Sequence, residues 1–179
     1  MATIDLLVQR LKSPETRRVA FEEVVRKYSR PLYMQIRRLV TWHDDADDVL
    51  QNTFMKAWLS LDSFRGESSI STWLYRIAFN ESLTHLSKQR ELVSLSDEEG
   101  GDARTLESDP YFDGDEVRVL LEKALQTLPD KQRIVFNLKY FDEMKYEDMS
   151  KMLDTSVGAL KASYHLAVKK IETFFEEYD

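Results

Sequence analysis

The sequence predicts an all-α protein made of two small helical domains joined by a flexible acidic linker. Its 179 residues include only five glycines and four prolines, whereas an all-β protein needs a turn about every 8–12 residues. Apolar residues recur at helical spacing on both sides of one strongly acidic segment. The length accommodates one ordinary domain or two small ones.

The acidic segment divides the chain by charge. The formal net charge is −7, and residues 91–116 alone carry −9, against +3 for residues 1–90 and −1 for residues 117–179. This segment holds three of the five glycines and little apolar periodicity, so it cannot bury enough surface to become ordered. We therefore expect a flexible linker at 91–116 between domains at 1–90 and 117–179. The alternative is a long surface loop of one domain, although structureless loops beyond about 15 residues are uncommon.

The first domain is predicted to contain three helical segments. Ser13 and Pro14 are typical of an N-cap followed by proline at the first helical position, and apolar residues recur at helical spacing up to residue 40. Carboxylates in a first turn favour a helix beginning near Asp44. A break at 62–68 precedes a long helix over 70–90, capped by Ser68 or Ser69. The buried stripe predicted for the middle helix is Ala46, Val49, Leu50, Phe54, Ala57, Trp58 and Leu61.

The second domain is predicted to end in two closely spaced helices. An apolar stripe from Val117 to Leu128 forms its first helix, and Pro129 stops that helix and opens the next. Residues 146–153 form a short helix, a turn follows at residues 154–155, and Ser156 caps a longer helix. This arrangement is a helix-turn-helix pattern, although any helical hairpin gives it. The core-facing residues predicted for the last helix are Val157, Leu160, Tyr164, Val168, Ile171 and Phe175.

Several classes of protein are excluded by what the sequence lacks. There is no cysteine, which excludes disulfides, thiolate metal sites and a cysteine nucleophile. His43, His85 and His165 are far apart, and the acidic cluster at 44–48 lacks the glycine and final glutamate of a calcium-binding loop. Glycine-rich phosphate loops are also absent. We therefore expect no catalytic site, no metal site and no cofactor.

The sequence also bears on location. No apolar run approaches the roughly 20 residues that a membrane span needs. Residues 1–10 lack the charged-then-apolar pattern of a secretory signal. The expected location is the cytoplasm, with no membrane insertion of the chain itself.

Residues 64–80 combine aromatic rings with arginine, asparagine and small polar residues. Such a mixture suits a protein that stacks unpaired bases, hydrogen-bonds their edges and neutralises phosphates. Trp73 belongs to a stripe with core spacing, so burial is the alternative for this side chain. Tyr75, Arg76 and Asn80 lie on a different arc of the helix and fit less easily into one core.

Two blocks of the sequence resemble one family. Residues 44–90, which include QNTFMKAWLSLDSFRG, and residues 125–172, which include YEDMSKMLDTSVGALKASYHLAVKKIE, are similar in order and spacing to extracytoplasmic-function sigma factors of the sigma-70 family. The resemblance covers nearly all of the chain except the linker and the termini. It implies the minimal form of the family, with sigma domain 2 at 1–90 and sigma domain 4 at 117–179.

The resemblance assigns a role to the polar face of the helix that begins near Asp44. In the family this face docks on the clamp helices of the beta-prime subunit of core RNA polymerase, and the beta subunit is a further partner. Asn52 departs from the glutamate that often follows glutamine in this motif. The implied docking residues are Asp47, Asp48, Gln51, Asn52 and Lys56.

The loop at 64–70 and the helix after it resemble the element that captures a base flipped from the non-template strand of the promoter minus-10 element. Unstacking a base costs about a few kcal/mol, and a pocket that binds the base recovers this cost. The implied residues are Phe64, Arg65, Gly66, Glu67, Ser68, Ser69, Trp73, Tyr75, Arg76 and Asn80.

The last helix resembles the recognition helix that enters the major groove at the minus-35 element. Many relatives carry several arginines on this helix, whereas this chain has lysines and one histidine, so bidentate reading of guanine by arginine is absent. We expect specificity from Lys161 and His165, from DNA shape and from van der Waals contact. The implied residues are Ser156, Ala159, Lys161, Ala162, His165 and Lys169, with Ser163 and Leu166 also facing outward.

These features predict an alternative sigma factor in transcription initiation, and not an enzyme. Its expected partners are core RNA polymerase, promoter DNA and a cognate anti-sigma factor. One alternative is a helix-turn-helix regulator that binds duplex DNA without polymerase, for which the polar face at Asp48, Gln51 and Asn52 has no use. The other is a helical adaptor with no role on DNA, for which changing Asn80 or Lys161 has no effect at a promoter.

Overall fold

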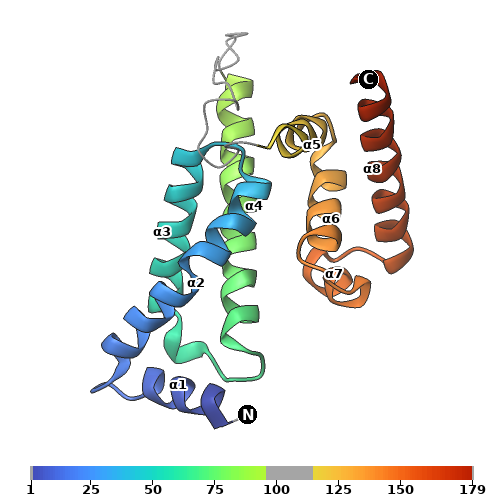
Figure 1. Ribbon diagram of the computed structural model, residues 1–179. Coiled ribbons are helices and arrows are strands. Elements are labelled where there is room, and N and C mark those ends of the chain that lie inside the picture. Colours follow the sequence, from blue (N-terminus) through green and yellow to red (C-terminus); the bar gives the residue numbers. More distant parts are fainter. Residues whose placement is uncertain (1, 96–114, 179) are drawn as a thin grey trace. The chain divides into compact units, whose positions relative to one another are not determined.

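The computed structural model describes residues 2–95 and 115–178 and is helical throughout these two ranges, apart from turns. They form two compact units, one from α1 to α4 and the other from α5 to α8 (Figure 1). The prediction of an all-α fold with two helical domains is therefore confirmed. The flexible linker predicted at 91–116 falls mainly on residues 96–114, which lie outside the described residues.

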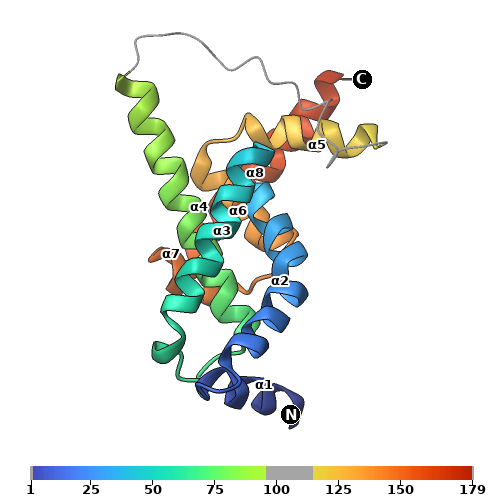
Figure 2. The same cartoon turned by 90° about the vertical axis from the view of Figure 1, so that its left-hand side faces the viewer.

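The first unit contains α1 (Ala2–Lys12), α2 (Arg17–Leu39), α3 (His43–Leu59), a 3-10 turn η1 (Leu61–Ser63) and α4 (Ile70–Leu95). Helices α2, α3 and α4 pack on one another, and α1 lies across one end, against α2 and η1 (Figures 1 and 2). Helix α4 begins where the sequence predicts but continues to Leu95 instead of ending at residue 90.

Two features at the start of this unit differ from the prediction. Helix α1, for which the sequence interpretation had no element, closes the end of the bundle with Leu11 buried. Ser13 and Pro14 lie in the turn before α2 instead of opening it. The Ser13 carbonyl accepts hydrogen bonds from the amides of Thr16 (3.2 Å) and Arg17 (2.9 Å), so these residues close a tight turn between the two helices.

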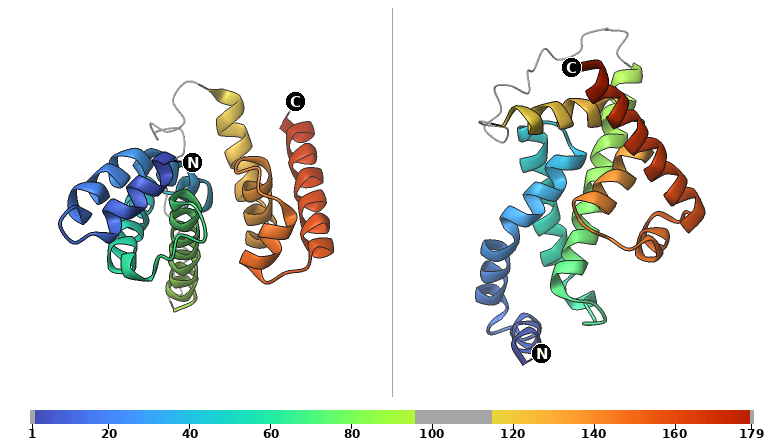
Figure 3. Two further views of the ribbon diagram at one scale, coloured as in Figure 1. Left: turned by 90° about the horizontal axis from the view of Figure 1, so that it is seen from below. Right: turned by 45° about the vertical axis from the view of Figure 1, so that its right-hand side comes forward.

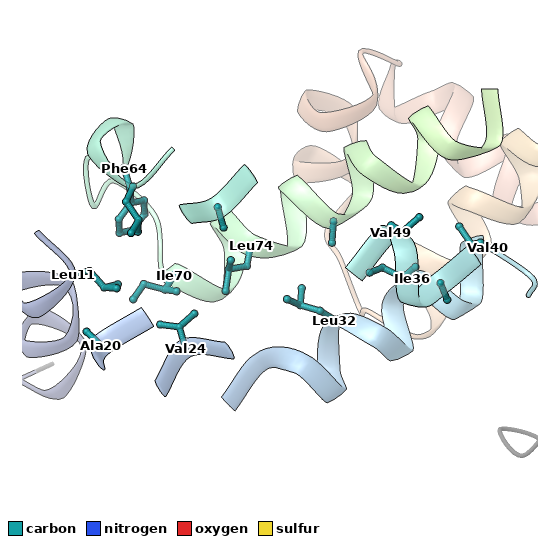
Figure 4. Packing of buried hydrophobic residues seen from close by; sticks show 14 residues of the cluster. Leu11, Ala20, Val24, Leu32, Ile36, Val40, Val49, Phe64, Ile70 and Leu74 are labelled. Carbon is teal, nitrogen blue, oxygen red and sulfur yellow. The ribbon is translucent and has the colours of Figure 1, made fainter. Parts of the chain in front are cut away.

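The core of the first unit lies between α2, α3 and α4, and α1 adds to it at one end. Side chains from all four helices converge there, among them Leu11, Leu32, Val49 and Leu74 (Figure 4). Trp58 departs from the buried stripe predicted for α3, because 41% of it is exposed while its ring meets the Phe21 ring edge-on at 5.1 Å. The buried residues of this unit are mainly aliphatic, together with the rings of Phe64 and Phe79.

The second unit contains α5 (Glu116–Gln126), α6 (Asp130–Tyr140), α7 (Tyr146–Leu153) and α8 (Val157–Tyr178). Helices α6 and α8 lie side by side, and α7 connects them at one end (Figure 3). Leu125, Leu128, Phe136 and Ile171 belong to its core. Val117 was predicted to belong to this stripe, but it is exposed because it lies in the first turn of α5, before the stripe meets α8.

The helix-turn-helix has the predicted bounds. Asp154 ends α7 in the left-handed region at φ 49°, and the Thr155 amide donates to the Ser150 carbonyl (3.3 Å). Ser156 Oγ then accepts the amide hydrogen of Ala159 (3.2 Å), which caps α8 as predicted. The direction of α8 therefore depends on one left-handed residue followed by a capping serine.

Substitution of Asp154 tests this turn. Asp154→Gly should leave the free energy of unfolding within about 0.5 kcal/mol of the wild-type value, because glycine adopts a positive φ freely. Asp154→Val should lower it by about 1–2 kcal/mol, because a β-branched side chain is strained there. Urea unfolding followed by circular dichroism measures both values. Equal losses in the two variants would contradict the left-handed turn.

Candidate nucleic-acid interface

The loop between η1 and α4 is anchored at both ends and exposed between them. Phe64 and Ile70 are buried, whereas residues 65–69 are exposed. Gly66 has φ +75°, a backbone conformation that residues other than glycine rarely adopt. Ser69 caps α4, because its Oγ accepts the Thr72 amide hydrogen (3.2 Å). We call residues 65–69 the capture loop; it is a short polar segment between two buried residues.

Phe64, one of the residues that the resemblance implies in base capture, is buried. Only 5% of this residue is exposed, and its ring centroid lies 4.9 Å from that of the half-buried Trp73. These two rings form an apolar base under the capture loop. Phe64 is buried because the η1 turn directs it towards α1 and Ile70, an arrangement that depends on a helix the sequence interpretation did not include.

The polar side chains of α4 that face solvent lie one turn apart. Arg76 and Asn80 are exposed, and Tyr75 is half-buried, with its carbonyl accepting a hydrogen bond from Gln35 Nε2 (3.3 Å). The guanidinium of Arg76 offers several donors, and the Asn80 amide offers both donors and an acceptor. Together with the capture loop, these groups can hold a phosphate and the edge of an unstacked base.

The exposed face of α3 changes character along its length. Asp48, Gln51 and Asn52 are exposed, and Asp47 is half-exposed with its Oδ2 3.3 Å from His43 Nε2. Lys56 is also exposed, but its ammonium forms an ion pair with Glu81 of α4. In the C-terminal part of α3, Met55 and Leu59 are exposed, with 78% of Leu59 accessible. Sequence periodicity missed this apolar end.

Most of the polar residues predicted on α8 face solvent. Lys161, Ala162, His165 and Lys169 are exposed, as is the apolar Leu166, whereas Ala159 and Ser163 are half-buried. The Ser156 hydroxyl is engaged in the helix cap. The face therefore presents two lysines and one histidine along about two turns of helix.

Tyr146, at the start of α7, is a neighbour of this face that the sequence interpretation missed. The ammonium groups of Lys139 and Lys161 lie 4.7 Å and 5.7 Å from its ring centroid. Burial raises the pKa of Tyr146, and the nearby Tyr164 raises it further, so the phenol stays neutral at physiological pH. An aromatic residue opening the first helix of the motif was the available signal.

Two protein-family models match the chain, one in each of the two units. Residues 24–91 match Sigma-70 region 2, and residues 118–171 match Sigma-70 region 4. The chain belongs to the sigma-70 family. It is an alternative sigma factor, which acts in promoter recognition and transcription initiation and not as an enzyme.

Curated relatives support the same assignment. The sigma factor is 31% identical over 176 residues to the RNA polymerase sigma-H factor of Pseudomonas aeruginosa, covering 93% of this chain and 90% of that protein. It is 29% identical over 180 residues to the ECF RNA polymerase sigma-E factor of Escherichia coli K12, covering 95% and 93%. The similarity therefore extends over nearly the full length of both relatives.

Solved structures show the same fold. The sigma factor RpoE of Bartonella quintana, solved with the anti-sigma factor NepR, has a TM-score of 0.73 and 26% identity, covering 87% of this chain and 96% of that one. CnrH, solved with the cytosolic domain of CnrY, has a TM-score of 0.66, 22% identity and coverage of 98% and 99%. Within the described parts of the sigma factor, no helix is long and apolar enough to cross a membrane.

Lys161 and His165 provide a test of the α8 face. Lys161→Ala and His165→Ala should each reduce the preference of the polymerase holoenzyme for a promoter with an intact minus-35 element by about threefold to tenfold. Lys170→Ala is the matched control, because Lys170 is exposed on the opposite side of α8, nine residues from Lys161. Competition binding between intact and scrambled elements measures the preference. Equal preference in all three variants would contradict the assignment.

Proposed function

We propose that this sigma factor binds core RNA polymerase through α3, captures a base of the minus-10 element with the capture loop and α4, and reads the minus-35 element with α8. The observation that carries the proposal is the order of the sigma-70 regions, each on a unit whose exposed polar face fits its task. The domain boundaries 1–90 and 117–179 are part of this proposal.

Docking on polymerase is proposed for the exposed face of α3. Its carboxylates and amides, at Asp47, Asp48, Gln51 and Asn52, offer specific hydrogen bonds to a helical partner. The exposed side chains of Met55 and Leu59 add apolar area next to these polar groups, and protein interfaces typically combine an apolar centre with a polar rim. The clamp helices of the beta-prime subunit are the partner that the resemblance implies.

Promoter melting is proposed to follow from base capture. The cost of extruding a base is about a few kcal/mol, and binding the base in a pocket offsets it, so reading and melting become one event. The capture loop suits this role because its backbone is exposed while its ends are fixed in the core. Arg76 is placed to neutralise a phosphate of the separated strand, and Asn80 to hydrogen-bond a base edge.

The minus-35 contact is proposed to be weak in isolation. Each phosphate that a protein neutralises adds affinity through release of counterions, and α8 presents few cations and no arginine. Polymerase, bound through α3, supplies the missing affinity. The sigma factor alone should therefore discriminate poorly between promoter and other duplex DNA.

A cognate anti-sigma factor and a cytoplasmic location complete the proposal. The sigma factor RpoE of Bartonella quintana, which has the same fold, was solved with the anti-sigma factor NepR, which supports an inhibitory partner for this chain. Because RNA polymerase is the proposed partner, the cytoplasm is the proposed place of action.

Run-off transcription tests the proposal as a whole. Purified core polymerase and genomic fragments should yield new start sites only when this sigma factor is added, because polymerase alone lacks promoter specificity. The housekeeping sigma factor on the same fragments is the control for template quality. No new start site on any fragment would reject the function.

Asn80 tests the capture step. Asn80→Ala should slow open-complex formation about tenfold at a promoter used by the wild-type protein, since one hydrogen bond to a base is worth about 1–2 kcal/mol. Binding to core polymerase should be unchanged. Ser87→Ala is the matched control, because Ser87 is exposed two turns farther along α4. Permanganate reactivity of unpaired thymines follows opening, and a loss of core binding in a pull-down would contradict the assignment.

A further inference from the structure

Two polar contacts join α3 to α4 and set how the two helices face each other. Near one end Glu81, only 8% exposed, forms an ion pair with Lys56. Near the other, Asp45 Oδ2 accepts a hydrogen bond from Gln89 Nε2 (2.9 Å) and lies 3.7 Å from His85 Nε2. Positions 81, 85 and 89 recur every four residues, so they form one stripe along α4.

Other buried polar side chains of the two helices bond within their own helix. Ala57 and Ala78 are fully buried and small, so they let the helices come close but carry no hydrogen bond. The buried hydroxyls of Thr53 and Ser82 donate to carbonyls of their own helices, Val49 (2.7 Å) and Ala78 (2.8 Å). A buried carboxylate, by contrast, requires its partner in one place.

Glu81 directly follows Asn80, the proposed base contact. Successive residues of a helix point about 100° apart, so a rotation that broke the Glu81 contact would turn Asn80 and Arg76 by the same angle. Lys56 lies on α3, the proposed docking helix. The ion pair therefore connects the helix that meets polymerase to the helix that meets the separated strand.

We propose that Glu81, acting through Lys56, is a positioning residue that fixes the angle at which α4 presents Asn80 and Arg76 when α3 is docked on polymerase. The proposal rests on the proposed function, since it concerns how that function is performed. It also assigns Lys56 to the contact with α4 in place of a contact with polymerase. Glu81 itself touches neither base nor phosphate.

A purely structural role for Glu81 predicts a different behaviour. Glu81→Leu removes the buried carboxylate and leaves Lys56, whose side chain is 59% exposed, in contact with water, so no uncompensated buried charge remains. Glu81→Leu should therefore keep or raise the melting temperature while it removes the directional contact. If Glu81 served stability alone, such a variant would open promoters normally.

The experiment compares holoenzymes at a promoter that the wild-type protein opens. Glu81→Leu and Glu81→Gln should slow open-complex formation by about threefold to thirtyfold, with core affinity and melting temperature maintained. The exchanged pair Lys56→Glu with Glu81→Lys should recover at least part of the rate. The control is Glu22→Leu, which breaks an exposed ion pair with Arg18 (3.3 Å) on α2 and should open at the wild-type rate.

The outcomes are distinct. Wild-type opening rates in both Glu81 variants would overturn the proposal. So would slow opening that follows a lowered melting temperature and does not recover in the exchanged pair, since this shows a structural role. Failure of the wild-type holoenzyme to open any promoter would instead reject the proposed function.

Discussion

The close packing of α3 against α4 is the constraint on which the first unit depends. Fully buried alanines at 46, 57 and 78, with buried hydroxyls at Thr53 and Ser82, let the backbones approach closely. The small residues of the two helices are buried in this packing, and the longer polar side chains of both helices face outward. The proposed docking face of α3 and the proposed capture face of α4 are thus two sides of one closely packed pair of helices.

The second unit depends on a local constraint instead. Asp154 and Ser156 end one helix and begin the next, and they leave α8 free of the core along the side that carries Lys161 and His165. The stacked rings of Phe136 on α6 and Tyr164 on α8, 5.8 Å apart, join these two helices. The proposed recognition helix is therefore held by a short turn at one end and by packing on α5 and α6 along its length.

Much of this architecture could be predicted because it is encoded locally. Caps such as Ser69 and Ser156 and the turn at Asp154 depend on residues within a few positions, and the sequence predicted them. The exposure of Trp58, the burial of Phe64 and the pair between Lys56 and Glu81 depend instead on which helices meet. Periodicity shows that a helix has an apolar side, but it does not show how much of that side its neighbours cover.

The acidity of the chain is consistent with a division of labour between it and polymerase. The net charge of the chain is −7, and residues 91–116 alone carry −9. The segments on either side carry +3 and −1, so both are close to neutral. A near-neutral domain gains little binding affinity from contacts with DNA phosphates, and such contacts carry no sequence information. In the proposed function, capture of one extruded base and a few groove contacts contribute specificity, while docking through α3 brings affinity. Strongly cationic domains would hold any duplex, and the holoenzyme would lose the distinction between promoter and bulk DNA.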